Sequence, residues 1–254
     1  MAGLFNKNAR EAVEARGQKP ELSKEVLEDE YRKLEAEGFP DGNRIRFISE
    51  LGNSGEIAYH YQLICKDWEE ETQLLLENSF DCHGEEGLKF LWEKLCKMGE
   101  QEKRKRAFTA YLMAICLSKL KYRTFYTSYC DCLAAFLTEL LEKEGEAFLR
   151  AKLIIALGWV GASNEIEVLI KQMHSDEDAL CRAWSATSLM QMSFHRVNKA
   201  VLQERTKAAF AGAISEEKDD YACGLILESV QTIFGKKWIT SSAIENIELE
   251  KIEK

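Results

Sequence analysis

The sequence predicts an all-α protein, and three observations support this fold class. Proline, which interrupts helices, occurs only at Pro20 and Pro40 in a chain of 254 residues. Beyond these positions alanine, leucine, glutamate and lysine predominate, and all four favour helix. Apolar residues recur at intervals of three and four residues, as on the buried face of a helix. Hydrophobic residues make up 46% of the chain, which is enough for a substantial core.

The first 55 residues are strongly charged and are divided by turn residues. A short polar helix is expected near the start of the chain, and residues 17–20 would end it. A charged helix with one apolar stripe should follow, then a loop rich in Gly, Pro, Asp and Asn, and then a helix that stops before a Gly-Asn-Ser-Gly turn. The expected segments are helix 1–16, helix 21–37, loop 38–43 and helix 44–51.

Residues 56–66 fit two patterns. Their apolar residues alternate as in a strand, but Ile57, His60, Tyr61 and Ile64 also share one face of a helix. The helical surroundings favour the helix. Residues 68–78 are expected to continue as helix, and residues 79–85 are expected to connect it to a helix over 87–98.

From here onward the pattern predicts helices in pairs with short connections. The expected helices cover 102–121, 125–143, 146–160, 164–174, 177–194, 198–215 and 218–234. The tail 241–254 carries isoleucines at near-helical spacing, so it either caps the end of the fold or frays.

One stretch recurs. Residues 149–161 read Leu-Arg-Ala-Lys-Leu-Ile-Ile-Ala-Leu-Gly-Trp-Val-Gly, and related stretches begin at 105, 181 and 222. When each start is numbered position 1, positions 1, 5, 8, 9 and 12 share one helical face, so we expect this face to pack. Position 2 is arginine in three of the four stretches, namely Arg106, Arg150 and Arg182.

Residues 149–161 resemble the inner helix of HEAT and HEAT-like repeats, and Asp178-Ala-Leu-Cys-Arg182 resembles the acidic lead-in and arginine of a next repeat. In the last stretch Cys223 replaces the arginine. The resemblance implies a right-handed α-solenoid of helix pairs over 86–235. It also implies that Arg106, Arg150 and Arg182 bond acidic residues and form a ladder between repeats. The remaining divisions are a charged helical N-terminal extension over 1–40, candidate degenerate repeats over 41–85, and a helical cap or tail over 236–254.

In this family the concave surface corresponds to positions 3, 7 and 11 of the inner helix. Here these positions carry no Lys or Arg, and in the first two stretches they are apolar. The candidate binding residues are Tyr111, Ile115, Ile155, Trp159, Thr187 and Gln191. An apolar groove with Tyr and Trp suits a helix or an extended peptide. The alternative is that helix 125–143 or a terminus covers these residues as core. A groove position predicts that Trp159→Ala abolishes partner binding and changes the unfolding free energy by less than about 1 kcal/mol.

The net charge of −9 lies in the first 100 residues, which hold 13 basic and 22 acidic side chains. Acidity weighs against nucleic acid or anionic membranes as partners, and it suits either a basic protein partner or solubility alone. No apolar run is long enough to span a membrane, and the start lacks the apolar core of a secretory signal. The 8 cysteines are scattered through apolar helical patterns, as expected for free thiols. We therefore expect a cytoplasmic protein.

Signals for catalysis or metal binding are weak. Cys130 and Cys132 would point roughly 200° apart on a helix, which prevents both from binding one ion. The four histidines at 60, 83, 174 and 195 form no motif, and no phosphate loop or nucleophile motif is present. The sequence thus predicts a non-enzymatic scaffold for a protein or peptide, with no cofactor, metal or catalytic residues. The alternatives are a HEAT-like DNA glycosylase, a lyase-like enzyme acting on bilins, or an acidic inhibitor or immunity protein for a basic partner.

Overall fold

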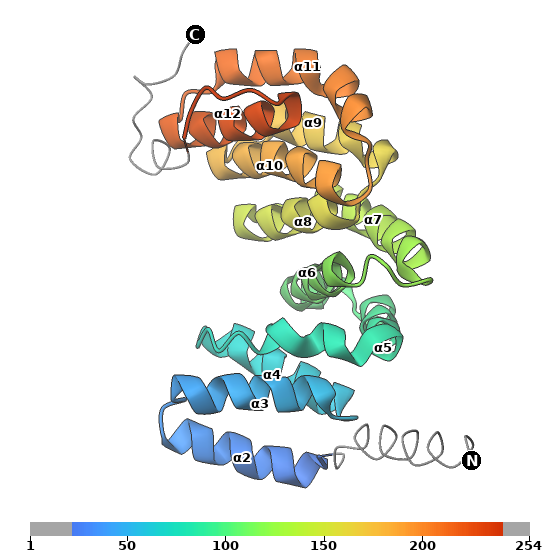
Figure 1. Ribbon diagram of the computed structural model, residues 1–254, viewed down its shortest axis with the longest axis vertical. Helices are drawn as coiled ribbons and strands as arrows, with labels where there is room; N and C mark the ends of the chain where they lie inside the picture. Colours follow the sequence, from blue (N-terminus) through green and yellow to red (C-terminus); the bar gives the residue numbers. More distant parts are fainter. Residues whose placement is uncertain (1–21, 241–254) are drawn as a thin grey trace, which may run out of the picture. The chain divides into compact units, whose positions relative to one another are not determined.

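A computed structural model describes residues 22–240 (Figure 1). Its described residues form eleven α-helices and no strand, which confirms the all-α prediction. The expectations for residues 1–16 and 241–254 lie outside the described residues. The described residues divide into two compact units between Phe90 and Leu91, and each unit is described by itself. None of the helices between residues 22 and 240 combines the length and apolar character needed to cross a bilayer.

The first unit contains helices α2 to α4, the 3-10 helix η1 and the start of α5. Their bounds are α2 Lys24–Ala36, α3 Asp41–Asn53, α4 Ile57–Glu70, η1 Leu76–His83 and α5 Gly84–Lys97. The ambiguous residues 56–66 are helical, as expected. Helix α3 begins three residues earlier than predicted because Pro40 precedes its first turn, where a missing N–H costs nothing. η1 packs against both α3 and α4.

The predicted continuation of helix through residues 68–78 is wrong, because α4 ends at Glu70. The Asp67 carboxylate accepts a hydrogen bond of 2.9 Å from the Leu74 backbone N–H and another from the Thr72 hydroxyl. These bonds offer the backbone an alternative to the helical ladder, so the chain turns. Three non-glycine residues of this turn have positive φ, namely Glu71, Gln73 and Leu75.

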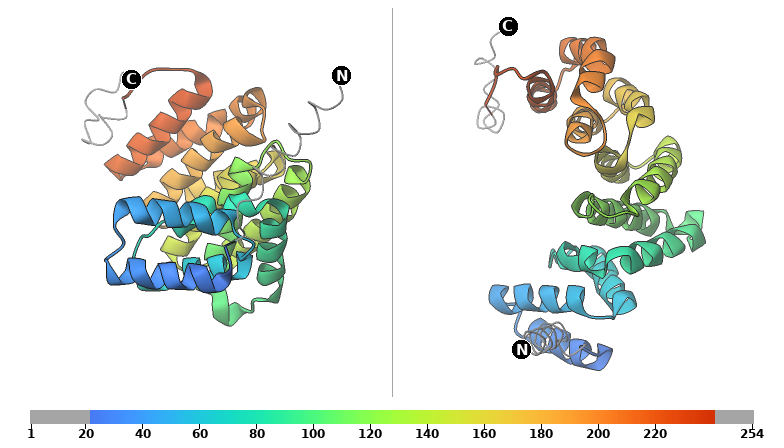
Figure 2. Two further views of the ribbon diagram at one scale, coloured as in Figure 1. Left: turned by 60° about the horizontal axis from the view of Figure 1, so that its bottom comes forward. Right: turned by 45° about the vertical axis from the view of Figure 1, so that its right-hand side comes forward.

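The second unit begins within α5 and alternates the helices that carry the repeated stretch with the helices between them. The template helices are α6 Lys103–Lys119, α8 Ala147–Val160, α10 Ala179–His195 and α12 Asp220–Phe234. The intervening helices are α7 Tyr126–Lys143, α9 Ile166–Ser175 and α11 Lys199–Glu216. The template helices pack in succession, α6 on α8, α8 on α10 and α10 on α12, while α7 packs on α8 and α9 packs on α10 and α11 (Figures 1 and 2).

The predicted packing face of the template helices is confirmed. Positions 1, 5, 8, 9 and 12 are buried in all four helices, except for the partly buried Lys105. Small residues allow close approach: a Cβ added to Gly158 of α8 would lie 2.8 Å from the Ser188 Cα of α10. The Ser188 hydroxyl donates a 2.9 Å hydrogen bond to the Ile154 carbonyl, and the Cys181 thiol lies 3.3 Å from the Ala147 carbonyl. Both bonds join residues 34 positions apart, so α8 and α10 run side by side in the same direction.

Candidate functional site

The six predicted binding residues, Tyr111, Ile115, Ile155, Trp159, Thr187 and Gln191, lie at positions 7 and 11 of the template helices, and all six are partly buried. The rings of Tyr111 and Trp159 pack together with centroids 5.5 Å apart. Position 3 is different, because Ala107, Ala183 and Gly224 are fully buried. Positions 7 and 11 therefore remain at the edge of a surface, whereas position 3 belongs to the core in three of the four helices.

Three large apolar residues on neighbouring template helices are much more exposed than the six predicted ones. Phe148, Leu180 and Tyr221 are 50%, 45% and 41% exposed, and each directly precedes the first buried position of its helix. Because α8, α10 and α12 pack in succession, these equivalent positions form a row across the three helices, which we call the apolar row. The repeat template does not include this row, because the template begins one residue later. The available signal was an apolar residue immediately before position 1 in three of four stretches.

Cationic side chains lie over aromatic rings where α6 meets α8. The Lys152 Nζ is 4.7 Å from the centre of the Tyr111 ring and 5.6 Å from that of Phe148. The Arg104 guanidinium carbon is 5.7 Å from the Phe108 ring centre and 5.9 Å from that of Phe148. Positions 3, 7 and 11 carry no Lys or Arg, but Arg104 and Lys152, at other positions of α6 and α8, lie beside the aromatic rings at this end. Aromatic and cationic groups together suit an apolar partner that carries a carboxylate.

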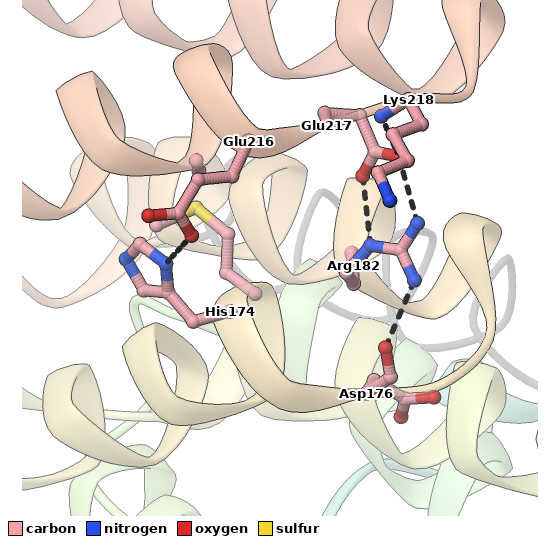
Figure 3. A pocket seen from close by; sticks show the side chains of 8 residues that line it. His174, Asp176, Arg182, Glu216, Glu217 and Lys218 are labelled. Carbon is pink, nitrogen blue, oxygen red and sulfur yellow. Dashed lines mark hydrogen bonds and ion pairs between the residues drawn. The ribbon is translucent and has the colours of Figure 1, made fainter.

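Two of the predicted ladder arginines form paired bonds with carboxylates. Arg150 donates from Nε and Nη2 to the two Asp176 carboxylate oxygens at 2.9 and 2.8 Å. Arg182 donates in the same way to Glu217, at 2.7 Å for both bonds (Figure 3). Such two-point contacts are the strongest and most directional that an arginine makes. In both cases the acid is the C-cap residue of the next intervening helix.

Further bonds join these two pairs into a continuous ladder. Arg150 Nη1 donates to the Gly145 carbonyl at 2.7 Å, and Arg182 Nη1 donates to the Asp176 carbonyl at 2.9 Å. Asp176 thus receives Arg150 on its side chain and Arg182 on its backbone. The hydrogen bonds from Arg182 lower the pKa of Glu217 to about 2, so Glu217 is ionised at any physiological pH. The ladder fixes the ends of α9 and α11 against the starts of α8 and α10.

A cavity of ≈ 300 Å³ lies beside the second pair of the ladder (Figure 3). Its lining is Met173, His174, Asp176, Arg182, Ala213, Glu216, Glu217 and Lys218. Its charged groups largely engage one another: Arg182 holds Glu217, and the His174 Nδ1 lies 4.0 Å from a Glu216 carboxylate oxygen. This arrangement favours a structural role for the cavity walls over recognition of a ligand.

Arg106 departs from the pattern of the other two arginines. Its guanidinium carbon lies 4.8 Å from the centre of the Phe136 ring, and its buried Nε has no hydrogen-bond partner within the described part of the chain. Lys103, one turn earlier in the sequence, instead approaches the C-cap residue of α7, Glu144, at 3.5 Å. The ladder therefore stops short of α6.

In the first unit the structure brings together two histidines that showed no motif in the sequence. The His60 Nε2–H donates to the Leu76 carbonyl at 2.8 Å, which leaves His60 Nδ1 to accept from His83 Nε2 at 2.9 Å. Burial lowers the pKa of each histidine to about 4. The pair, held neutral, ties α4 to η1. Across residues 22–240, no three His, Cys, Asp or Glu side chains gather as a metal site would require.

The chain matches no protein-family model, no curated protein and no solved structure.

Proposed function

We propose that this chain is a non-enzymatic scaffold, a right-handed HEAT-like α-solenoid over its second unit, that binds a helical segment of another protein on its template helices. The observation that carries the proposal is the apolar row of Phe148, Leu180 and Tyr221. Isolated exposed apolar residues are ordinary, but an exposed residue at the same position of three successive helices is a repeated feature. Tyr111 and Trp159 extend this surface toward α6.

The spacing of the apolar row matches an amphipathic helix. Packed helices lie about 8–10 Å apart, so neighbouring members of the row recur at roughly that distance. Seven residues of an α-helix rise about 10.5 Å. A helix lying across α8, α10 and α12 would therefore offer one apolar side chain to each member of the row, at positions i, i+7 and i+14.

Charge suggests the polar character of one end of that helix. Lys152 and Arg104 lie beside Phe148, at the α6 end of the surface. A carboxylate in the bound segment near its contact with Phe148 would be favoured, and this local attraction acts within a Debye length of about 10 Å. The net charge of −9 suits a basic partner or solubility alone, whereas the cations beside Phe148 favour a bound segment that is acidic at this end.

The experiment compares two variants of the full chain as bait for affinity capture. The row variant carries Phe148→Ser, Leu180→Ser and Tyr221→Ser. The matched control carries Tyr122→Ser and Phe194→Ser, which remove exposed apolar groups, 89% and 55% exposed, outside the row. We expect wild type and control to retain the same protein, the row variant to lose it, and a zero-length crosslink to join Lys152 to a carboxylate of an amphipathic helix in that protein.

Equal recovery by the row variant contradicts this function, and so does a crosslink that maps only to the first unit. Capture of nucleic acid or a bilin pigment by wild type, retained by the row variant, would favour the enzymatic alternatives. These outcomes separate the scaffold from a HEAT-like glycosylase or lyase.

A further inference from the structure

The three intervening helices end in the same way. Their C-cap residues are Glu144, Asp176 and Glu217, whose side chains are only 7%, 1% and 2% exposed. Each carboxylate accepts a hydrogen bond from the backbone N–H two residues later, at 2.8, 2.9 and 3.0 Å respectively. Glu144 is therefore the structural equivalent of the two carboxylates that complete the ladder.

Arg106, at position 2 of α6, does not use this carboxylate. In Arg150 and Arg182 the Nε and Nη2 groups donate hydrogen bonds to the two oxygens of one carboxylate. In Arg106 the equivalent Nε is buried without a partner. A buried donor without an acceptor is destabilising, so the missing acceptor for the Arg106 Nε–H requires a structural explanation. Phe136 stacks on the guanidinium at 4.8 Å and holds its plane in place.

This arginine lines a cavity of ≈ 330 Å³ between α6 and α7. The lining consists of three cations, three carboxylates and three apolar residues: Lys103, Arg106, Lys143, Glu100, Glu139, Glu144, Ala107, Leu140 and Leu153. Two pairs are satisfied internally, Lys143 with Glu139 at 2.8 Å and Lys103 with Glu144 at 3.5 Å. In the described part of the chain the Arg106 guanidinium and the Glu100 carboxylate form no ion pair within 4.0 Å, although Arg106 interacts at longer range with Glu139 and Glu100 with Lys143.

We propose that this cavity binds a small zwitterion of the amino-acid class. The carboxylate of the ligand would accept from the Arg106 guanidinium, and a rotation of this side chain would uncover the buried Nε so that the Nε and Nη2 edge donates as it does in Arg150 and Arg182. Its ammonium would face Glu100, and an apolar side chain would lie against Leu140 and Leu153. A simple anion fits less well because three carboxylates line the same walls. The volume suits such a ligand, since one water occupies about 30 Å³.

The test is isothermal titration calorimetry of the full chain with each of the common amino acids. The strongest binder is then compared with its N-acetyl derivative, which lacks the ammonium, and with its amide, which lacks the carboxylate. We expect one or more amino acids with apolar side chains to bind, and each single-charge analogue to bind at least about tenfold more weakly. Both Arg106→Gln and Glu100→Gln should cause the same loss, whereas Lys105→Gln, which removes a neighbouring cation outside the cavity lining, should bind as wild type does.

Three results would overturn the proposal. The first is the lack of binding heat with any amino acid at about 10 mM. The second is equal affinity in wild type and Arg106→Gln. The third is a melting temperature of ligand-free Arg106→Gln that falls as far as that of ligand-free Arg150→Gln. Arg106 would then already donate to Glu144 within the ladder, and its Nε and Nη2 groups could not bind a ligand. The proposal is independent of the apolar row.

Discussion

Asp176→Asn should strongly destabilise the second unit, because Asp176 sits at the centre of the arginine ladder. Both Arg150 and Asp176 are almost fully buried, and two bonds of 2.9 and 2.8 Å join them. Removing one partner of such a pair leaves the other charge buried and uncompensated, which lowers the unfolding free energy by about 3–5 kcal/mol. The asparagine oxygen can still accept from the Asp178 N–H, which Asp176 binds at 2.9 Å. The expected loss therefore lies near the lower end, about 3 kcal/mol.

The assay is urea unfolding followed by circular dichroism at the helical minimum. The chain supplies a matched control in Glu177, whose carboxylate lies 3.7 Å from the same Arg150 Nη2 but is 86% exposed. Glu177→Gln removes the same charge and should change the unfolding free energy by less than about 0.5 kcal/mol, because water and salt screen an exposed pair. The double variant Arg150→Met with Asp176→Leu should recover most of the loss, since apolar residues can replace a buried pair.

Equal unfolding free energies for Asp176→Asn and Glu177→Gln would show that the buried pair does not stabilise the second unit more than the exposed one. A double variant less stable than Asp176→Asn alone would show that the uncompensated charge is not the cause of the loss.

Three more predictions concern packing and titration. The pKa of His60 in the folded protein is about 4, below its ordinary 6.5. The neutral pairing of His60 with His83 therefore stabilises the fold fully above pH 6.5. As the pH falls from 6.5 toward 4, the unfolding free energy should decrease by about 3 kcal/mol from His60. Urea unfolding at pH 7.5 and 4.5 checks this. Because the pKa of His83 is lowered in the same way, the double variant His60→Gln with His83→Gln should flatten the dependence, and an equally steep dependence in that variant refutes it. Gly158→Ala should lower the unfolding free energy by about 1–2 kcal/mol because the new methyl meets the α10 backbone, whereas Gly145→Ala, which meets nothing within 4 Å, should be neutral in the same urea assay. Trp159→Ala should lower the unfolding free energy by about 2 kcal/mol, because the ring is partly buried against α6. This exceeds the change of less than about 1 kcal/mol that a groove position predicts. A loss below about 1 kcal/mol in urea unfolding would show that the ring is freely exposed.

Most helices could be predicted from the sequence because their apolar spacing, helix-favouring composition and turn residues agree. The repeat template also identified the buried face, since positions 1, 5, 8, 9 and 12 follow from helical geometry alone. The turn after Glu70 could not be predicted in this way. It depends on the Asp67 side chain folding back onto the backbone, a local competition that apolar periodicity does not report.

The candidate site was only partly predictable for a different reason. The template indicated which helical face is buried, but the exposure of Phe148, Leu180 and Tyr221 depends on where each helix begins relative to its neighbours. The resemblance implied that Arg150 bonds an acidic residue but did not identify Asp176 as that residue. The pairing of Glu144 with Lys103 instead of Arg106 depends on the packing of Arg106 against Phe136. Likewise, His60 and His83 are 23 residues apart and meet only because η1 folds back on α4.

We propose that a partner docks on the apolar row. Hydroxyl-radical footprinting tests it directly, because it reports the solvent access of individual side chains with and without the captured partner. We predict that the oxidation rates of Phe148, Leu180 and Tyr221 fall together when the partner binds, while Tyr122 is unchanged. Oxidation of the row at the same rate in the complex as in the free chain would show that the partner docks elsewhere.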